Sequence, residues 1–312
     1  MSIYKNKEMV KVSYYYYKKG LTQGEIAKKM NMSRQRVNRI LKRALEDNIV
    51  QIKINDMDKY NVELENKLED KFSLRQSVVI TPIDDNTIYG ALGIAGAEYL
   101  EGILTKDDMI GVTWGRTLSE VAKRLSYNEK LNVSAVQLIG GLNIAYTDWP
   151  AEEITRPIGK KLGGDSHILY APAIVESKKI KDAFMSDSNL KETFENMGKC
   201  NIIIAGIGEL KEDTQLHREE HLNEEYKKHL FSQGCVGDIG FRWFDKDGNP
   251  IRHNYYDRTI GYDILENKND ALVVGIAGGE KKYDAILGAL RGNYLDVLIT
   301  DSDMAKRLIY HC

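Results

Sequence analysis

Residues 22–48, TQGEIAKKMNMSRQRVNRILKRALEDN, carry two helix-start signals in succession. Thr22 followed three residues later by Glu25 forms a capping-box pattern, and Ser33 stands where it can cap a second helix. Apolar residues recur with the helical period in that second helix, at Val37, Ile40, Leu41, Ala44 and Leu45. Two short helices joined by a tight turn are typical of a helix-turn-helix, in which the second helix is the reading helix.

The polar residues of this stretch predict operator DNA as the partner. Arginine pairs with guanine, and glutamine or asparagine with adenine, and each good pair discriminates between bases by about 1 to 3 kcal/mol. The first turns of a reading helix face base edges, whereas basic residues further along meet phosphate. The predicted DNA-contacting residues are Thr22, Gln23, Ser33, Arg34, Gln35, Arg36, Asn38, Arg39 and Arg43. The alternative is a basic helix that is merely solvated.

The flanking residues extend the predicted DNA-binding domain to residues 1–55. Residues 4–19 indicate a supporting helix that contains the tyrosine run 14–17, for which packing against the helix pair is favoured over stacking on nucleotides. Residues 49–54, IVQIKI, alternate like a short strand beside the motif. Residues 56–76 are the predicted linker. Its helical pattern over residues 60–72 suits either pairing with its copy in a dimer or capping the next domain.

Charge is divided along the chain. Residues 1–55 hold thirteen Lys or Arg and four Asp or Glu, a net charge of +9, so the remainder carries −11 to reach the total of −2. This division indicates a small nucleic-acid-binding module joined to a larger acidic one. The length of 312 residues and the hydrophobic content of 42% favour two domains. No apolar run approaches the roughly 20 residues that cross a bilayer, so we expect no membrane partner and a cytoplasmic location.

The sequence predicts neither a metal nor a cofactor. Cys200, Cys235 and Cys312 are widely spaced without a CxxC pair, which suggests neither a disulfide framework nor a zinc ribbon. HREEH at residues 217–221 matches an inverted zincin pattern, but two ligands without a third make no catalytic zinc site. GIG at residues 206–208 lacks the third glycine and the opening helix of a dinucleotide fingerprint.

From residue 77 to residue 312 the sequence predicts an α/β domain. Short β-branched apolar runs end in Gly, Pro or Asp, and most precede an amphipathic helix. The runs are residues 78–81, 109–113, 135–139, 168–171, 202–205, 272–276 and 297–300. This alternation indicates a parallel, Rossmann-like sheet. Because such sheets bind ligands at the carboxyl ends of their strands, the turns after these runs form the candidate site.

The turn GVTWGRTL, residues 111–118, has the residue types of an anion site. A strand runs into Gly115, and Arg116 and Thr117 begin a helix. Helix-start amides, a hydroxyl and a guanidinium together suit a phosphate or a carboxylate. The alternative is a tight strand-to-helix turn with a solvated Arg116.

Three further turns offer polar or closely approachable backbone. QLIGG, residues 137–141, ends in Gly140 and Gly141, which allow a ligand to approach the main chain. Asp238 could accept hydrogen bonds from a polyol, or bond nearby amides as turn aspartates often do. Lys281 or Lys282, after the glycines of residues 275–279, could supply a second cation to an anionic ligand or be merely solvated.

Eight sequence blocks occur in a characteristic order across nearly the whole chain: YYYKKGLTQGEIAKKMNMSRQRVNRILKRA, GVTWGRTL, QLIGGL, GIGEL, GDIGFRWFDKDG, RTIGYD, AGGEKKYDAILGALRGNY and VLITD. In order and spacing they resemble the SorC/DeoR-type family of bacterial sugar-responsive transcriptional regulators. The resemblance implies an effector domain related in fold to sugar-phosphate isomerases and CoA transferases. It also implies a phosphorylated sugar as effector and a homo-oligomer, a dimer or a tetramer, whose binding to an operator the effector controls.

The resemblance assigns roles to individual positions. The family's phosphate loop falls on Gly115, Arg116 and Thr117, its hydroxyl-binding acid on Asp238, and its lysine after the last glycine pair on Lys282. Ile139 stands before the glycine pair where some relatives have a basic residue, which removes one charge contact with the sugar. In the loop NIAYTDWPAEE, Trp149 and Glu152 could cover the ligand.

Two rival functions are weaker. An isomerase-like enzyme with an appended DNA-binding domain would use Asp238 or Glu209 as its base. No pair of titratable groups has assignable acid and base roles, and a fused DNA reader favours sensing, so we predict no catalytic residues. A purely architectural DNA-binding protein would not explain several glycine-rich turns after successive parallel strands.

Overall fold

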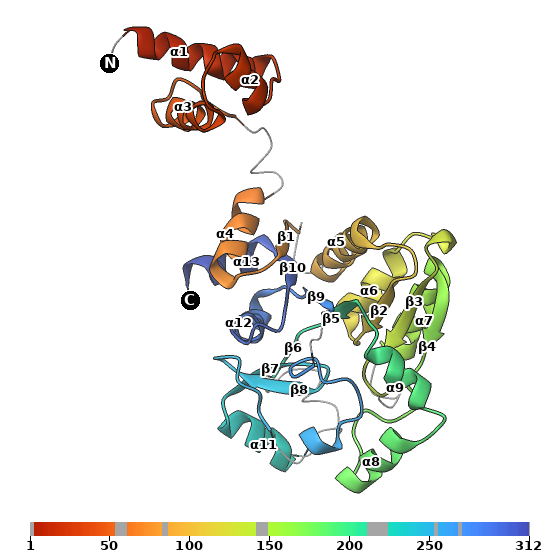
Figure 1. Cartoon of the computed structure of the whole chain (residues 1–312). Coiled ribbons are helices and arrows are strands. Elements are labelled where there is room, and N and C mark those ends of the chain that lie inside the picture. The colour runs from red at the N-terminus through yellow and green to blue at the C-terminus, as the bar shows by residue number, and fades with distance from the viewer. Residues whose placement is uncertain are drawn as a thin grey trace. The chain divides into compact units, whose positions relative to one another are not determined.

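The computed structural model describes residues 3–53, 61–82, 87–141, 149–210, 224–252, 255–267 and 270–311. The chain divides into two compact units, Met1–Met57 and Asp58–Cys312 (Figure 1). Each unit has its own hydrophobic core. The predicted fold class, a helix-turn-helix joined to a parallel α/β unit, is confirmed.

The described residues of the first unit form three helices and one π-helical turn. They are α1 (Ile3–Ser13), η1 (Tyr14–Lys18), α2 (Gln23–Lys29) and α3 (Arg34–Glu46). Both predicted caps form: the Thr22 hydroxyl accepts from the Glu25 amide at 3.3 Å, and the Ser33 hydroxyl accepts from the Arg36 amide at 3.1 Å. The helices enclose a core of Val12, Ile26, Ala27, Val37 and Leu41.

One local expectation for this unit is corrected, and the tyrosine run is divided between core and surface. Residues 49–53 form no strand; the Val50 amide donates to the Ala44 carbonyl at 2.9 Å, and Ile52 is exposed. Alternating residues need a partner strand, and the described residues of this unit contain none. The tyrosine run is divided, because Tyr15 packs against the core whereas the other three tyrosines are exposed.

The second unit begins with α4 (Val62–Phe72), which covers the edge of the main sheet. The Glu69 carboxylate accepts from the Ser77 amide at 2.7 Å, and the Glu65 carboxylate accepts from the Val79 amide at 2.9 Å. These amides belong to the edge strand β1 (Gln76–Ile80), and no strand among the described residues lies on that side. The helix predicted within the linker therefore occupies β1's open hydrogen-bonding positions.

Seven parallel strands form the main sheet in the order β1-β10-β9-β5-β2-β3-β4. The strands after β1 are β2 (Met109–Val112), β3 (Val133–Gln137), β4 (Gly163–His167), β5 (Ile202–Ala205), β9 (Leu272–Ile276) and β10 (Val297–Asp301). One predicted run is misplaced, because residues 168–171 follow β4 instead of forming it. Ile168, Leu169 and Ala171 are buried. The apolar run therefore correctly indicated burial but not the pairing of a strand.

Helices cover both faces of this sheet. On one face lie α5 (Ile88–Ile103), α6 (Arg116–Arg124) and α7 (Ala151–Leu162), and on the other α4, α9 (Lys191–Met197), α12 (Tyr283–Arg291) and α13 (Ser302–Tyr310). The neighbouring β5 residues Ile203 and Ile204 point into these two different cores. Such burial on both faces explains why the strands read as continuous apolar runs.

A smaller antiparallel sheet completes the second unit. It consists of β6 (Gly208–Glu209), β7 (Cys235–Ile239) and β8 (Arg242–Asp245). Beside it lie α11 (Glu224–Ser232) and the turn η5 (Tyr256–Arg258) (Figure 1). Tyr226, Phe241 and Trp243 form its separate apolar cluster. The remaining elements are α8 (Lys178–Ser186) and the short turns η3 (Glu129–Leu131) and η6 (Glu280–Lys282).

Lys161 of α7 secures the carboxyl end of α6. Its ammonium group donates to the carbonyls of Ala122, Lys123 and Leu125 at 2.9, 2.8 and 2.8 Å. These carbonyls lie at the end of α6, where a cation also interacts favourably with the helix dipole.

Lys161→Met should lower the free energy of unfolding by about 1 to 3 kcal/mol, because it keeps the apolar stem and removes three charge-assisted hydrogen bonds. Urea denaturation of the full chain measures this loss. The matched control is Lys160→Met at an exposed neighbour, which should change the free energy by less than about 0.5 kcal/mol. Equal effects of the two substitutions would contradict the capping role.

Candidate functional site

The reading helix α3 presents one polar face to solvent. Val37, Leu41 and Ala44 are buried, and at about 3.6 residues per turn the opposite side carries Gln35 and Arg39. All the DNA-contacting residues predicted on this helix are exposed: Arg34, Gln35, Arg36, Asn38, Arg39 and Arg43. The geometry therefore favours Gln35 and Arg39 as the side chains that point most directly away from the core.

Two of the predicted contacts lie on a flank of α3 and are already paired. Arg36 Nη2 lies 2.9 and 3.1 Å from the two carboxylate oxygens of Glu8 on α1. Arg43 Nε lies 3.3 Å from Asp47. Both pairs are largely exposed, so each contributes about 1 kcal/mol or less to stability. Nothing in the local sequence signals the Glu8 contact, because its partner is 28 residues away.

In the second unit, the predicted anion turn lies between β2 and α6. Gly115 has φ +128°, a conformation that favours glycine. Gly115 is the N-cap of α6 and has no side chain that could accept from the first-turn amides. The exposed Arg116 guanidinium lies 4.1 Å from the ring centre of Tyr89 and 5.8 Å from that of Trp149, while Thr117 is buried. Donors and a cation thus converge at this helix start.

The aromatic partners of Arg116 come from distant parts of the chain. Trp149, expected to cover a ligand, lies beside Arg116, whereas Glu152 falls in the first turn of α7. Tyr89 at the start of α5 was not expected. The sequence around Tyr89 does not indicate a binding site, because its apolar pattern is that of a helix packed in the core.

Asp238 occupies a buried position on β7 opposite Gly208. Its side chain is 4% exposed, and Oδ2 accepts from the Phe241 amide at 2.9 Å. Oδ1 has no hydrogen-bond partner among the described residues. A Cβ at Gly208 would stand 1.9 Å from this oxygen, so glycine is required there. Burial raises the pKa of Asp238 to about 6, against the lowering effects of the Phe241 amide and Lys282.

Lys282 and Glu209 lie beside this carboxyl. The Lys282 ammonium donates to the Ile207 carbonyl, and burial lowers its pKa against the opposing effects of Glu209 and Asp238. Glu209 Oε2 is buried and has no hydrogen-bond partner in the described part of the chain. The sequence suggested Glu209 only as a rival enzyme's base; its place beside Lys282 follows from the pairing of β6 with β7.

The anion turn and the Asp238 hairpin touch each other. The Trp114 and Phe241 rings have centroids 5.4 Å apart. A Cβ at Gly240 would lie 3.8 Å from the Thr113 side chain, whose hydroxyl accepts from the Gly206 amide at 3.1 Å. The residues after β2 and β5, parallel strands with a common carboxyl end, therefore lie beside the turn between β7 and β8.

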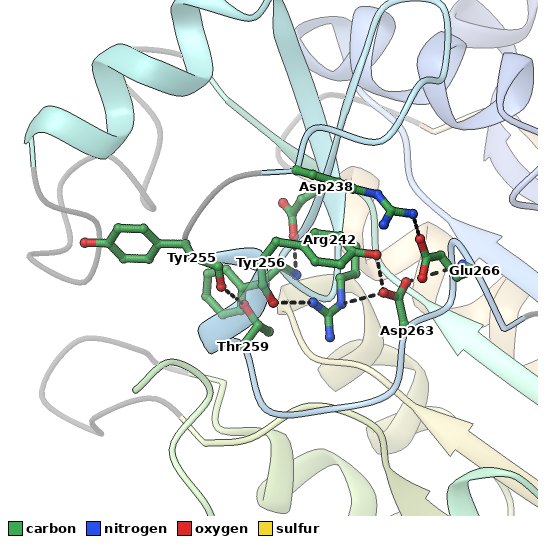
Figure 2. A network of polar contacts seen from close by, with 9 residues as sticks. Asp238, Arg242, Tyr255, Tyr256, Thr259, Asp263 and Glu266 are labelled. Atoms are coloured by element: carbon green, nitrogen blue, oxygen red, sulfur yellow. Dashed lines mark hydrogen bonds and ion pairs between the residues drawn. The ribbon is translucent and has the colours of Figure 1, made fainter. Parts of the chain in front are cut away.

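A polar network fixes the hairpin that carries Asp238 (Figure 2). Arg242 of β8 is 2% exposed; its Nη1 donates to the Tyr256 carbonyl at 3.0 Å, and its Nε lies 3.5 Å from Asp263. The Tyr256 hydroxyl donates to the same Asp263 oxygen. Removing one member would leave a buried charge unpaired, so the network holds β8 firmly against the loop after it.

Gly140 and Gly141 are bonded within the chain. The Gly140 amide donates to the Ile260 carbonyl at 3.0 Å and the Gly141 amide donates to the Ala171 carbonyl at 2.8 Å. A Cβ at Gly140 would stand 2.5 Å from the Pro172 carbonyl oxygen. These amides are already used by the chain, and the close approach that Gly140 permits is made by another loop.

Three further observations bear on the predicted sites. The HREEH segment at residues 217–221 lies outside the described residues. Within the described ranges, no cluster of three His, Cys, Asp or Glu side chains is arranged to bind a metal ion. Helices in the same ranges include none with the length and apolarity needed to span a membrane.

Both units match known protein families. Residues 59–310 match the family described as "Putative sugar-binding domain", and residues 8–47 match sigma-70 region 4. The deoxyribonucleoside regulator of Bacillus subtilis (strain 168) is 31% identical over 296 residues, covering 94% of each chain. The sorbitol operon regulator of Klebsiella pneumoniae is 28% identical over 307 residues, covering 96% of this chain and 97% of the relative.

Solved structures agree with these matches. The full-length sorbitol operon regulator SorC from Klebsiella pneumoniae superposes with a TM-score of 0.76 at 28% identity, covering 97% of this chain and 99% of that one. A DeoR family regulator from Listeria monocytogenes superposes with a TM-score of 0.72 at 27% identity, covering 79% of this chain and 98% of its own. With a helix-turn-helix and a sugar-binding unit in one chain, the protein belongs to the SorC/DeoR-type family of sugar-binding bacterial transcriptional regulators.

Proposed function

We propose that the chain regulates a carbohydrate-utilisation operon and that a phosphorylated sugar controls its binding to the operator. The observation that carries the proposal is the position of Arg116 at the uncapped start of α6. A phosphate there would meet the helix-start amides, the Thr117 hydroxyl and the guanidinium together. An unphosphorylated sugar would leave this cation and these amides unused.

The sugar end of the ligand is assigned to the hairpin. Asp238 Oδ1 and Glu209 Oε2 are buried acceptors without donors among the described residues. Buried acceptors are costly unless a donor reaches them, and sugar hydroxyls are such donors. Lys282 would contact the same end and balance the carboxylates. Gly140 and Gly141 would form part of the wall.

The regulatory arrangement separates reading from sensing. We assign residues 1–55 to DNA binding, 56–76 to the linker and 77–312 to effector binding and assembly as a dimer or tetramer; the linker's helix α4 packs on the second unit. Because the two sites are separate, the ligand can act only by favouring one arrangement of the reading heads, a coupling typically worth about 1 to 3 kcal/mol. Relatives named for sorbitol and deoxyribonucleosides support a carbohydrate effector.

An isomerase-like activity is the rival, and one observation favours it. The pKa of Asp238 near 6 would suit a general base. We propose binding without turnover, because the matched relatives are named as regulators. Conversion of an added sugar phosphate by the purified chain would reverse this assignment.

Thermal unfolding of the full chain across paired sugars and sugar phosphates tests the effector. A ligand at 100 times its dissociation constant should stabilise the protein by about 2.7 kcal/mol. Only phosphorylated members should act, and Arg116→Ala should abolish their effect without lowering the ligand-free transition. Lys123→Ala at the far end of α6 is the control and should respond normally. Stabilisation by free sugars, or by the phosphates in Arg116→Ala, would remove the phosphate site.

Asp238→Asn should make the ligand-free chain more stable at neutral pH. The folded pKa is raised, so the group's contribution is full below its unfolded value of 3.8 and is lost as the pH rises through about 6. The gain in the variant should grow between these limits to about 2 to 3 kcal/mol above pH 6. Urea denaturation of both proteins at about pH 4.0, 5.0 and 7.5 measures this gain, because these pH values lie near the unfolded pKa, between the two pKa values and above the folded pKa. A pH-independent difference would contradict a buried, perturbed carboxyl.

Arg39→Ala should weaken operator binding by about 1 kcal/mol or more, because Arg39 lies on the outward face of α3. Fluorescence anisotropy with operator DNA measures this loss, while sugar phosphate stabilisation should be unchanged. Simultaneous loss of DNA and ligand binding would show that the assignment of separate domains is wrong.

A further inference from the structure

The first unit contains a cavity of about 440 Å³ at the junction of three elements. It is lined by Tyr16 of η1, Thr22, Gln23 and Gly24 at the start of α2, and Arg34 at the start of α3. We call it the Tyr16 cavity. Three of its five residues were predicted to contact DNA from their positions in the motif, whereas Tyr16 belongs to the tyrosine run that precedes the motif.

A π-helical turn accounts for the outward position of Tyr16. The Lys19 amide donates to the Tyr14 carbonyl at 3.1 Å, five residues back, which is one residue more than an α-helical turn contains. Tyr15 packs on the core, with Lys29 over its ring at 5.4 Å. Tyr16 and Tyr17 are then 36% and 39% exposed, and they contact each other edge to face at 4.9 Å. Such turns recur at functional sites in helices.

The lining offers hydrogen-bond donors and one cation. Tyr16 supplies a phenol, Gln23 a carboxamide and Arg34 a guanidinium. The Thr22 hydroxyl is already engaged, because it donates to the Glu25 carboxylate at 2.8 Å. The described lining residues include no carboxylate, although the Glu25 carboxylate accepts from the Thr22 amide and hydroxyl at the edge of the lining. This set suits a singly charged phosphodiester, which accepts from neutral side chains as well as from arginine.

The cavity's place relative to α3 separates it from base reading. Arg34 is turned away from the side that carries Gln35 and Arg39, toward the start of α2. A DNA strand whose bases face Gln35 and Arg39 would place its sugar-phosphate backbone along the side of α3 that carries Arg34. We propose that the Tyr16 cavity receives one backbone phosphate of bound DNA, with the Tyr16 hydroxyl and the Arg34 guanidinium as donors. This contact is independent of the sugar phosphate assigned to the second unit.

Because a phosphate contact is independent of base sequence, the test needs no known operator. The full chain is titrated onto a duplex of random sequence and about 24 base pairs, a length of about two helical turns that can hold the two half-sites of a dimer. Binding is measured over a range of low salt concentrations. Tyr16→Phe should weaken it by about 5-fold to 20-fold, because only a hydroxyl donor to a charged group is lost. The salt dependence should stay the same, because phenol carries no charge.

Two variants serve as references. Tyr17→Phe, a neighbour of similar exposure outside the cavity lining, should bind within about twofold of the parent. Arg34→Ala should weaken binding and reduce the slope of log K against log salt by about 0.9, as expected for one phosphate contact. In Arg34→Ala/Tyr16→Phe the effect of the tyrosine change should shrink, since both act on one phosphate.

Two outcomes would overturn the proposal: unchanged binding in Tyr16→Phe, or equal losses in Tyr16→Phe and Tyr17→Phe. A third is stabilisation of the DNA-free chain by inorganic phosphate that depends on Tyr16, which would assign the cavity to a small anion. Thermal stabilisation by sugar phosphates should be identical in all these variants, so failure here leaves the effector assignment intact.

Discussion

The parallel pairing of β2 with β5 and of β5 with β9 is the constraint on which the effector unit depends. Parallel strands share a carboxyl end, so segments separated by more than a hundred residues reach one edge of the sheet. At that edge the turn before Arg116 meets the hairpin of Asp238, and Trp114 packs on Phe241. The turn before Arg116 is therefore held by the end of a parallel strand, and the contacts of Arg242 with Tyr256 and Asp263 hold the hairpin of Asp238.

The sequence predicted those features that arise from local chemistry. The caps at Thr22 and Ser33 depend on residues three apart, and the parallel sheet depends on apolar runs buried on both faces. Predictions failed where strand formation depends on a partner that is distant in the sequence. The strand expected at residues 49–54 has no partner strand in the described part of its unit, and the run at residues 168–171 is buried outside the strand ladders.

The same limit applies to the candidate sites. The turn sequence was enough to suggest Asp238 as a site residue. The burial of its Oδ1, however, requires Gly208 on the neighbouring strand, which the local sequence does not reveal. Tyr89 and Glu209 acquire their positions only through tertiary packing, so neither carries a local signal. In the DNA-binding unit, helix periodicity indicated which residues of α3 are exposed. It could not indicate that Arg36, on one side of the reading helix, forms an ion pair with Glu8.

The cover that α4 provides for β1 has a consequence for assembly. Glu65 and Glu69 bind the outward amides of this strand, and Asn61 donates to the Val79 carbonyl at 2.9 Å. An exposed edge of this kind would template the addition of a strand from another chain, which leads to open-ended fibres. With β1 closed in this way, copies of the protein cannot extend the sheet at that edge. Ordered association there must proceed through side-chain surfaces, whose shape limits the number of subunits.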